Sequence, residues 1–208
     1  MKEYWESRFK EEGAMWAFEP SDSAVKACTI FQSHSVRHVL IPGVGYGRNA
    51  KVFYDKGFTL TGIEISKSAI ALAKENGLDF KIHHGSVTSM PFDEELYDGI
   101  FCYAMLHLLT KPQRHKFLQS CYDQLKPGGI MVFSVVSREA TMYGKGTLVS
   151  KDRFEVMKGV TVYFYDEDSI KKEFSDFGLA ECENISEPIK HMTGQEPLKL
   201  KFVLCKKP

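Results

Sequence analysis

The chain has no excess of charge of one sign, and this absence bears on its partners. Lysine plus arginine and aspartate plus glutamate number 27 each, so the formal net charge is zero. Domains that bind nucleic acid usually carry a strong basic field, which a balanced chain lacks. We therefore expect a small-molecule partner and no nucleic acid.

Long apolar runs are absent as well. No stretch approaches the ~18–20 apolar residues that a membrane-spanning helix needs. Residues 1–13, MKEYWESRFKEEG, lack the apolar centre of a signal peptide. Five cysteines are present, but none forms a C-x-x-C pair and their number is odd, which is typical of reduced thiols. These features predict a cytoplasmic protein without a membrane segment.

Repeats, low-complexity tracts and shifts of composition are also missing, so the 208 residues are predicted to form one domain. What is present is an alternation of strand-like and helix-like stretches. Strands are predicted at 37–41, 58–65, 79–83, 97–103, 130–136, 180–185 and 198–205, and helices at 48–56, 67–76, 113–125 and 166–176. This pattern predicts an α/β fold with a doubly wound, mainly parallel seven-stranded sheet and a closing antiparallel hairpin.

The single domain is predicted to have four parts. They are an N-terminal helical cap (1–36), a ligand-binding core (37–136), a lid or substrate insertion (138–165) and a C-terminal helix with strands (166–208). The third part shows no clear periodicity and is too long for a plain connection. Ser21 and Ser66 are predicted helix N-caps, and Gly77 is a predicted helix stop.

A glycine-rich turn follows the first predicted strand. Residues 39–49, VLIPGVGYGRN, contain Gly43, Gly45 and Gly47, and such a turn lets a ligand approach the backbone. A dinucleotide fingerprint needs its third glycine where the chain has Arg48, and a P-loop needs Gly-Lys-Ser/Thr where the chain has Gly-Arg-Asn. The spacing therefore argues against both of these phosphate-binding turns.

An acidic residue follows the turn at the spacing that an adenosine ligand requires. Glu64 ends the second predicted strand, 64 − 43 = 21 residues after the first glycine, where an acid can accept both ribose hydroxyls. Because the turn lacks the third glycine of a pyrophosphate site, the pattern favours an adenosine ligand without phosphate. S-adenosylmethionine is such a ligand, and its amino-acid end can lie against the turn.

Four stretches in order resemble the class I S-adenosylmethionine-dependent methyltransferases. They are HVLIPGVGYGRNA, LTGIEISKSAIALAKE, FKIHHGSVTSMPFDEELYDGIFCYAMLHLL and SCYDQLKPGGIMVF, and they lie within about half the chain. LKPGG before an apolar strand is highly characteristic of the family. The resemblance implies a Rossmann-like methyltransferase fold, S-adenosyl-L-methionine as cofactor, S-adenosyl-L-homocysteine as product, and in-line methyl transfer as the reaction.

The chain departs from the family pattern at two positions. Ile41 stands where the family usually has an acid, and Ser86 stands where it often has aspartate. The Pro-Gly form and the segment YWESRFKEEGAMWAFEPS are similar to the thiopurine and thiol methyltransferases, while GRN resembles the tellurite-resistance methyltransferases. Both branches imply a small-molecule acceptor, with a thiol or another soft atom as the nucleophile.

The resemblance also implies a set of cofactor-binding residues. They are Gly43, Val44, Gly45, Gly47, Glu64, Ile65, Ser86, Val87, Tyr103, Trp16 and Arg48. The glycine turn would carry the methionine part, and Glu64 would hold the ribose. Ser86 and Val87 would contact the adenine edge, while Ile65 would pack on the ring. Arg8 and Arg48 are candidate partners of the cofactor carboxylate.

Two residues are candidates for catalysis. Tyr103 ends the fourth predicted strand, where an aromatic face can attract the sulfonium. His107 in AMLHLL occupies a position where the family often has histidine, which can take a substrate proton near neutral pH. The adjacent His83 and His84 point to opposite faces of a strand, so they cannot readily share a metal and no metal site is predicted.

Residues at both ends of the predicted core would close the site. Trp5, Arg8 and Trp16 lie in the segment that closes over the cofactor in the resembling branch. The predicted lid contains Met142, Tyr143, Phe154, Met157, Tyr163, Phe164 and Tyr165. Arg138 and Arg153 are candidates for orienting a polar acceptor.

Other functions stay open at this point. A methyltransferase acting on RNA or protein is opposed by the balanced charge and by CYAM in place of an N/D-P-P-Y/F motif. A nicotinamide-dependent oxidoreductase is opposed by the glycine spacing and by LKPGG. A cofactor-binding module without turnover is compatible with the two departures. The sequence leaves a monomer or a homodimer equally possible.

Overall fold

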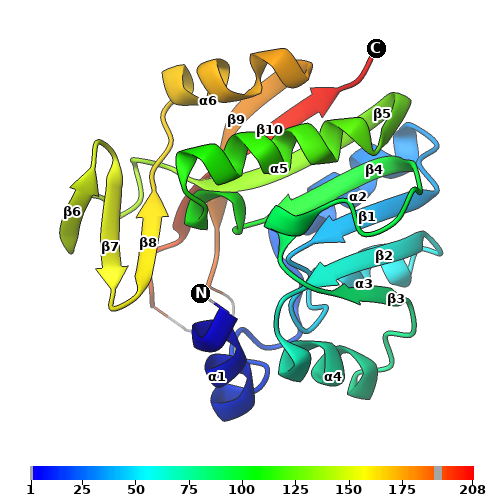
Figure 1. Ribbon diagram of the computed structural model, residues 1–208, viewed down its shortest axis with the longest axis horizontal. Helices are drawn as coiled ribbons and strands as arrows, with labels where there is room; N and C mark the ends of the chain where they lie inside the picture. The colour runs from blue at the N-terminus through cyan, green and yellow to red at the C-terminus, as the bar shows by residue number, and fades with distance from the viewer. Residues whose placement is uncertain (1, 190–193) are drawn as a thin grey trace.

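The computed structural model describes residues 2–189 and 194–208, and its centre is a seven-stranded sheet (Figure 1). The strands are β1 His38–Pro42, β2 Thr59–Glu64, β3 Lys81–His84, β4 Tyr97–Tyr103, β5 Leu125–Val136, β9 Leu179–Glu187 and β10 Leu198–Lys206. They lie in the order β3-β2-β1-β4-β5-β10-β9, with β10 antiparallel to both of its neighbours and the others parallel. The predicted doubly wound sheet with its closing hairpin is confirmed.

Helices cover both faces of this sheet. They are α1 Lys2–Glu12, α2 Asp22–Ser33, α3 Ala50–Tyr54, α4 Lys67–Glu75, α5 Lys111–Asp123 and α6 Glu167–Phe174. In β1, Val39 and Ile41 pack in the cluster that contains α2 and α3, whereas Leu40 packs in the cluster that contains α5 and α6. Because both faces are buried, the strands read as almost continuous apolar runs. None of the described helices is long and apolar enough to cross a membrane.

Three predicted helix boundaries are confirmed. The Oγ of Ser21 accepts a hydrogen bond from the Ala24 N–H (3.1 Å) at the start of α2. The Oγ of Ser66 accepts one from the Ala69 N–H (3.1 Å) at the start of α4. Gly77 follows the C-terminus of α4 with φ +75°. Each boundary depends on a local rule, which is why sequence alone locates it.

Residues 138–165 do not form the irregular stretch that the sequence predicts. They contain a second sheet of three antiparallel strands, β6 Thr147–Ser150, β7 Arg153–Met157 and β8 Val160–Tyr163, in that order. This sheet stands at the left of Figure 1, beside the carboxyl end of β5. The strands have only four or five residues each, too few for an alternating pattern to be recognised. Its role as a lid stays a prediction, as does the division of the chain into four parts.

The strand order reverses beside β1, which has β2 on one side and β4 on the other. In open α/β sheets, ligands bind outside the carboxyl ends of the strands at such a switch point. At this edge β1 leads into the glycine turn, β2 ends at Glu64 and β4 ends at Tyr103. The topology therefore brings the turn, the acid and the aromatic residue to one place.

Candidate ligand-binding site

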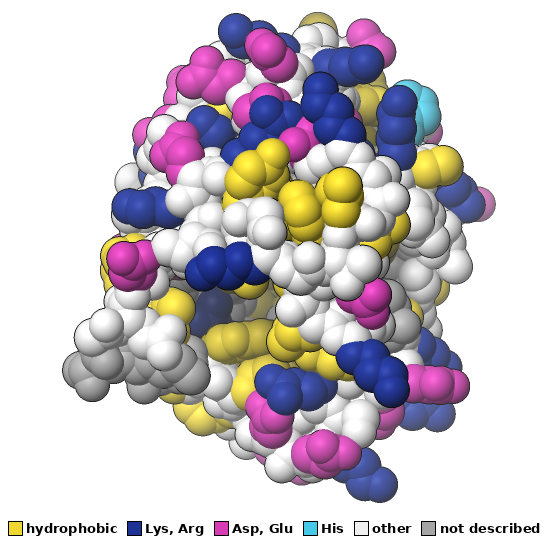
Figure 2. Space-filling model, turned by 90° about the vertical axis from the view of Figure 1, so that its left-hand side faces the viewer, with side chains coloured by type: hydrophobic (Ala, Val, Ile, Leu, Met, Phe, Trp, Pro, Cys, Tyr) yellow, Lys and Arg dark blue, Asp and Glu magenta, His cyan; other side chains and the backbone are white. Residues whose placement is uncertain are grey.

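A cavity of about 770 Å³ opens at the carboxyl ends of β1, β2 and β4. Figure 2 looks onto this side of the molecule, where a hollow with hydrophobic side chains opens in the surface. Helix α1 contributes Trp5 and Phe9 to its lining, and the second sheet contributes Arg153 and Thr161. The volume lies within the ~300–1,000 Å³ that is usual for small-molecule sites.

The first two glycines of the turn expose their backbone to this cavity. Gly43 and Gly45 line it and have φ of +69° and +59°, a backbone conformation that glycine adopts without strain. The N–H groups of Gly43 and Val44 both donate to the Ile63 carbonyl (2.8 and 3.1 Å), which ties the turn to β2. A Cβ atom on Gly43 would lie 3.0 Å from the Cγ of Met105. The turn is therefore rigid and closely packed behind its exposed face.

The third glycine has a different role from the predicted one. Gly47 does not line the cavity, and a Cβ atom there would lie 2.1 Å from the Cδ1 of Leu78. Its φ is +83°. The structure thus makes Gly47 a packing residue between the start of α3 and the end of α4, a position that does not support the predicted contact of Gly47 with a cofactor.

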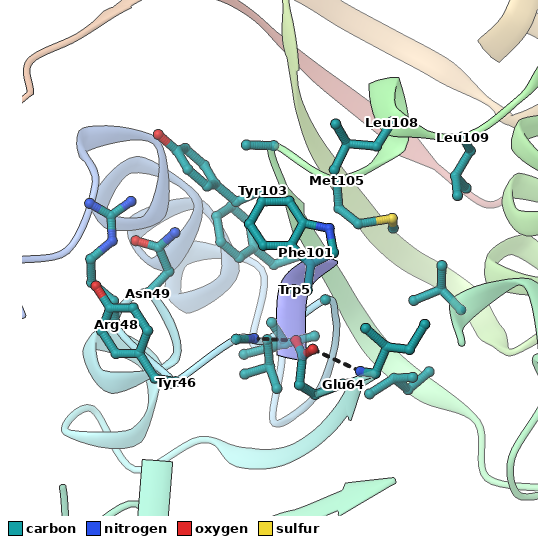
Figure 3. A pocket seen from close by; sticks show the side chains of 18 of the residues that line it. Trp5, Tyr46, Arg48, Asn49, Glu64, Phe101, Tyr103, Met105, Leu108 and Leu109 are labelled. Carbon is teal, nitrogen blue, oxygen red and sulfur yellow. Dashed lines mark hydrogen bonds between the residues drawn. The ribbon is translucent and has the colours of Figure 1, made fainter. Parts of the chain in front are cut away.

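Glu64 connects the end of β2 to the glycine turn. One carboxylate oxygen accepts from the Gly45 N–H (2.8 Å), and the other accepts from the N–H groups of Ile65 and Ser66 (2.8 Å each). The side chain lines the cavity although its residue is only 6% exposed. Burial raises the pKa of Glu64, and the backbone N–H donors of Ser66, Gly45 and Ile65 oppose that rise. Figure 3 shows the Glu64 carboxylate with a hydrogen bond to each of its oxygens dashed.

Beside Glu64, three further predicted residues line the cavity. They are Ile65, Ser86 and Val87. The Oγ of Ser86 accepts from the Thr88 N–H (3.3 Å) and caps the short helix Val87–Ser89. Serine and aspartate are both good N-caps, so Ser86 preserves the local geometry at this departure from the family pattern.

Tyr103 and Arg48 lie together on the wall of the cavity opposite Leu108 and Leu109 (Figure 3). The guanidinium carbon of Arg48 is 5.6 Å from the centroid of the Tyr103 ring. Burial raises the pKa of Tyr103, so its hydroxyl stays protonated at neutral pH. The next residue, Ala104, has φ +52°, and such strain in a non-glycine residue tends to occur at functional sites.

The N-terminal segment covers the glycine turn with aromatic rings. The rings of Trp16 and Tyr46 stack 6.4 Å apart, and the Phe9 ring lies 6.1 Å from that of Tyr46. The Tyr46 hydroxyl also accepts from the Trp16 N–H (3.2 Å). Trp5, Phe9 and Trp16 line the cavity, whereas Arg8 forms an ion pair with Glu12 and does not. Of the two predicted arginines, only Arg48 reaches the cavity.

One carboxylate fastens α1 to the start of α4. Glu6 accepts hydrogen bonds from the Oγ of Ser66 and the Oγ of Ser68 (2.8 Å each) and from the Ser68 N–H (3.3 Å). The bonds from Ser66 and Ser68 lower the pKa of Glu6 from 4.5 to about 2. A lowered folded-state pKa means that this stabilisation is present above pH 4.5 and is lost as the pH falls toward 2.

Acidification is therefore expected to release α1 before the core unfolds. Trp5 and Trp16 are the only tryptophans in the sequence, and both lie in this segment, so tryptophan emission reports its docking. Tryptophan emission should shift to the red below pH 4.5, while the far-UV circular dichroism spectrum stays that of the folded protein. Glu6→Ala should shift emission already at pH 7, and Glu3→Ala, an exposed change on the same helix, should not. Identical emission in the Glu6 variant and the wild type would refute the docking role.

His107 does not reach the cavity. It is 7% exposed, is absent from the cavity lining, and its Nδ1 accepts from the Val136 N–H (3.2 Å). Burial lowers the pKa of His107 to about 3, and the charges of Arg153 and Arg114 add to this effect. In this position His107 is a neutral group that holds β5, and the geometry does not support its predicted proton-accepting role.

The adjacent histidines also have separate structural partners. The Nε2 of His83 lies 2.7 Å from a carboxylate oxygen of Asp93, and the Nε2 of His84 lies 3.2 Å from the Ile65 carbonyl. In residues 2–189 and 194–208, no group of three His, Cys, Asp or Glu side chains could hold a metal ion.

The predicted lid residues pack away from the cavity. None of the seven lines it; Met142, Phe154 and Phe164 instead pack with Val136 and Leu200 at the base of the second sheet. Arg138 forms ion pairs with Asp152 and Asp166 and also lies outside the cavity. The two residues that the second sheet contributes to the described lining are Arg153, which the sequence singled out, and Thr161, which it did not.

Several lining residues escaped the sequence analysis. They are Phe9, Tyr46, Asn49, Phe101, Met105, Leu108, Leu109, Thr110, Gln113, Thr161, Glu187 and Leu198, among others. The stretch 104–110 follows the fourth parallel strand, so its position at the ligand edge was a signal available from topology. No comparable signal marked Thr161, Glu187 or Leu198.

Residues 40–133 match the family model described as a methyltransferase domain. The ubiquinone biosynthesis O-methyltransferase of Pseudomonas entomophila (strain L48) is 29% identical over 114 residues, which cover 51% of this chain and 47% of that protein. The chain therefore spans about half the length of the curated relatives it matches.

Solved structures extend the similarity to the whole fold. The 1,6-didemethyltoxoflavin-N1-methyltransferase of Burkholderia thailandensis, with bound 1,6-didemethyltoxoflavin and S-adenosylhomocysteine, has a TM-score of 0.75 at 17% identity, over 99% of this chain and 86% of that chain. TehB from Haemophilus influenzae has a TM-score of 0.67 at 16% identity, over 98% and 67%. The predicted Rossmann-like methyltransferase fold is thereby confirmed. None of these proteins singles out the thiopurine, thiol or tellurite-resistance branch.

Proposed function

We propose that this chain uses S-adenosyl-L-methionine to transfer a methyl group to a small-molecule nucleophile. The match of residues 40–133 to the methyltransferase domain and the fold of the whole chain support the reaction class. The small-molecule acceptor is supported by the ubiquinone-pathway and toxoflavin methyltransferases that the chain is similar to.

The observation that carries the proposal is the continuity of one cavity. It runs from the glycine turn and Glu64 to Leu109 and Arg153 at the second sheet. A cofactor on the turn would leave the far end for an acceptor. Because α1 covers one side with Trp5, the cavity fits a small molecule better than a polymer.

The residues around the turn fit the cofactor. Glu64 accepts three backbone hydrogen bonds, and a carboxylate offers about four lone-pair sites, so a ribose hydroxyl could add to these bonds or replace one of them. Gly43 and Gly45 offer exposed backbone to the methionine part. Arg48 is the basic side chain at the turn that would meet its carboxylate.

Methyl transfer places few chemical demands on these side chains. The nucleophile's lone pair forms a bond to the methyl carbon as the carbon–sulfur bond breaks, and the electron pair returns to a neutral thioether that needs no acid. Alignment of reacting atoms ~3–3.5 Å apart, with water excluded, then supplies much of the rate. A thiol acceptor, with a pKa near ~8.5, is partly ionised near neutral pH and depends less on a protein base than an amine or hydroxyl acceptor does.

The proposal is tested by thermal unfolding with S-adenosylhomocysteine, S-adenosylmethionine and NADH in separate titrations. A ligand at about 100 times its Kd adds ~2.7 kcal/mol, which raises the midpoint of a chain of this size by roughly 5–10 °C. We expect both S-adenosyl compounds, and not NADH, to produce this rise. Thiols, amines and phenols would then be screened for methylated products. No rise with either S-adenosyl compound would overturn the proposal.

A further inference from the structure

Arg153 is a buried cation at the far end of the cavity. It is the first residue of β7 and is 9% exposed. It lines the cavity together with Thr161, Leu108 and Leu109. The cofactor-binding turn lies at the other end of this lining, so Arg153 belongs to the part that would receive the acceptor.

All hydrogen-bond partners of Arg153 in the described chain are neutral. Its Nη1 donates to the Leu109 carbonyl (2.6 Å), and its Nη2 donates to the Leu108 carbonyl (3.1 Å) and to the Oγ1 of Thr161 (2.5 Å). A guanidinium has five N–H donors, so two remain after these three bonds. Among residues 2–189 and 194–208, no carboxylate forms an ion pair with Arg153.

Neighbouring arginines show what Arg153 lacks. Arg114 pairs with Glu173 at 2.6 Å, and Arg138 pairs with both Asp152 and Asp166. Arg114 also donates to the Leu109 carbonyl (3.3 Å), so two guanidinium groups share one acceptor. Burial and the charge of Arg114 both lower the pKa of Arg153. Arg153 is thus the guanidinium of the three that has no carboxylate partner among the described residues.

A desolvated cation without a counter-charge is costly to bury. Three dipolar acceptors hold Arg153 in place, but they carry no negative charge. Leu108 and Leu109, whose carbonyls Arg153 contacts, also line the cavity, and their apolar side chains would exclude water from a bound molecule. An anion in this part of the cavity would complete the charge pair, while its remaining atoms would pack on the leucines.

We propose that Arg153 is the residue that selects the methyl acceptor, and that this acceptor is a small, mainly apolar molecule bearing a carboxylate. The proposal rests on the proposed methyltransferase function and adds the chemical class of the second substrate. Arg153 pairs with the carboxylate and so orients the acceptor, while the nucleophilic atom lies toward the cofactor.

The test uses matched pairs of small molecules that differ only in charge: phenylacetate with phenylacetamide, and hexanoate with hexanamide. Their binding to protein saturated with S-adenosylhomocysteine would be measured by saturation-transfer NMR and calorimetry at pH 7. Wild type should bind each carboxylate about 10- to 100-fold more tightly than its amide, as for a hydrogen bond to a charged group. Equal binding of both members of each pair would overturn the proposal.

Variants separate recognition from a structural role. In Arg153→Met the carboxylate should bind no more than about twofold more tightly than its amide. Arg153→Lys should keep part of the preference for the carboxylate because the positive charge remains. Arg138→Met, which removes a surface arginine that already has carboxylate partners, should keep the full preference. An undiminished preference in a folded Arg153→Met protein would overturn the proposal. If that variant fails to fold, the wild-type comparison still decides.

Binding of S-adenosylhomocysteine, measured first in the same samples, distinguishes the two proposals. Bound S-adenosylhomocysteine with no carboxylate preference would refute the role of Arg153 and leave the proposed function standing. Absence of S-adenosylhomocysteine binding would instead remove the proposed function.

Discussion

Glu64→Gln is expected to weaken S-adenosylhomocysteine binding by roughly 10- to 100-fold, the usual loss when a charged hydrogen-bond partner is removed. The Glu64 carboxylate accepts hydrogen bonds from three backbone N–H groups. The glutamine side chain would turn its NH₂ group, which cannot accept a hydrogen bond, toward some of these N–H donors. The variant therefore loses both the ribose acceptor and the bond that ties Gly45 to the end of β2.

Isothermal titration with S-adenosylhomocysteine measures this effect, and thermal unfolding reports the accompanying loss of stability. Asp98→Asn is a matched control, because Asp98 accepts from the backbone N–H groups of Arg37 and His38 at the amino end of the sheet (3.0 and 2.8 Å). The control should lose stability and keep its affinity. If Glu64→Gln and Asp98→Asn lost affinity to the same extent, Glu64 would act only through stability.

Gly47→Ala is expected to destabilise the protein by about 3 kcal/mol while leaving cofactor affinity nearly unchanged. Its φ of +83° penalises any side chain, by roughly 1–2 kcal/mol. The added Cβ would also lie 2.1 Å from the Cδ1 of Leu78, and overpacking of this kind costs about 1–3 kcal/mol. For a chain of this length the unfolding midpoint should fall by roughly 6–12 °C.

Gly57→Ala isolates the backbone part of this cost. Gly57 has φ +77°, and nothing lies within 4 Å of a Cβ atom there, so only the conformational strain applies. The difference between the two variants, measured by thermal unfolding, gives the packing contribution of Gly47. In a double-mutant cycle, Leu78→Ala should offset part of the Gly47→Ala loss. A Gly47→Ala protein with an unchanged midpoint and a strongly reduced cofactor affinity would instead support the predicted cofactor-binding role of Gly47.

Gly43 and Gly47 show that the spacing of glycines in a motif does not determine the role of each glycine. Gly43 and Gly47 belong to one turn and share a positive φ, so the sequence treats them alike. In the structure Gly43 lies at the cavity and Gly47 lies against Leu78. The side chain that makes the difference comes from a separate segment 31 residues further along (78 − 47 = 31), and a local pattern contains no information about it.

By itself, the sequence determined the features that depend on neighbouring residues. These are the alternation of strands and helices, the N-caps at Ser21 and Ser66, the glycine turn, and the acid at the end of the second strand. Because parallel strands end at a common edge, the alternation also places the turn, Glu64 and Tyr103 at the same edge of the sheet.

Only the tertiary structure decided which side chains face the cavity and with which charge. His107, Phe164 and Tyr165 are turned into packed interiors, while Arg153 reaches the cavity from a short strand with no recognisable pattern. Glu6 meets Ser66 and Ser68 across about 60 residues of chain. Burial and long-range pairing are properties of the folded chain, because each depends on residues brought into contact from distant segments.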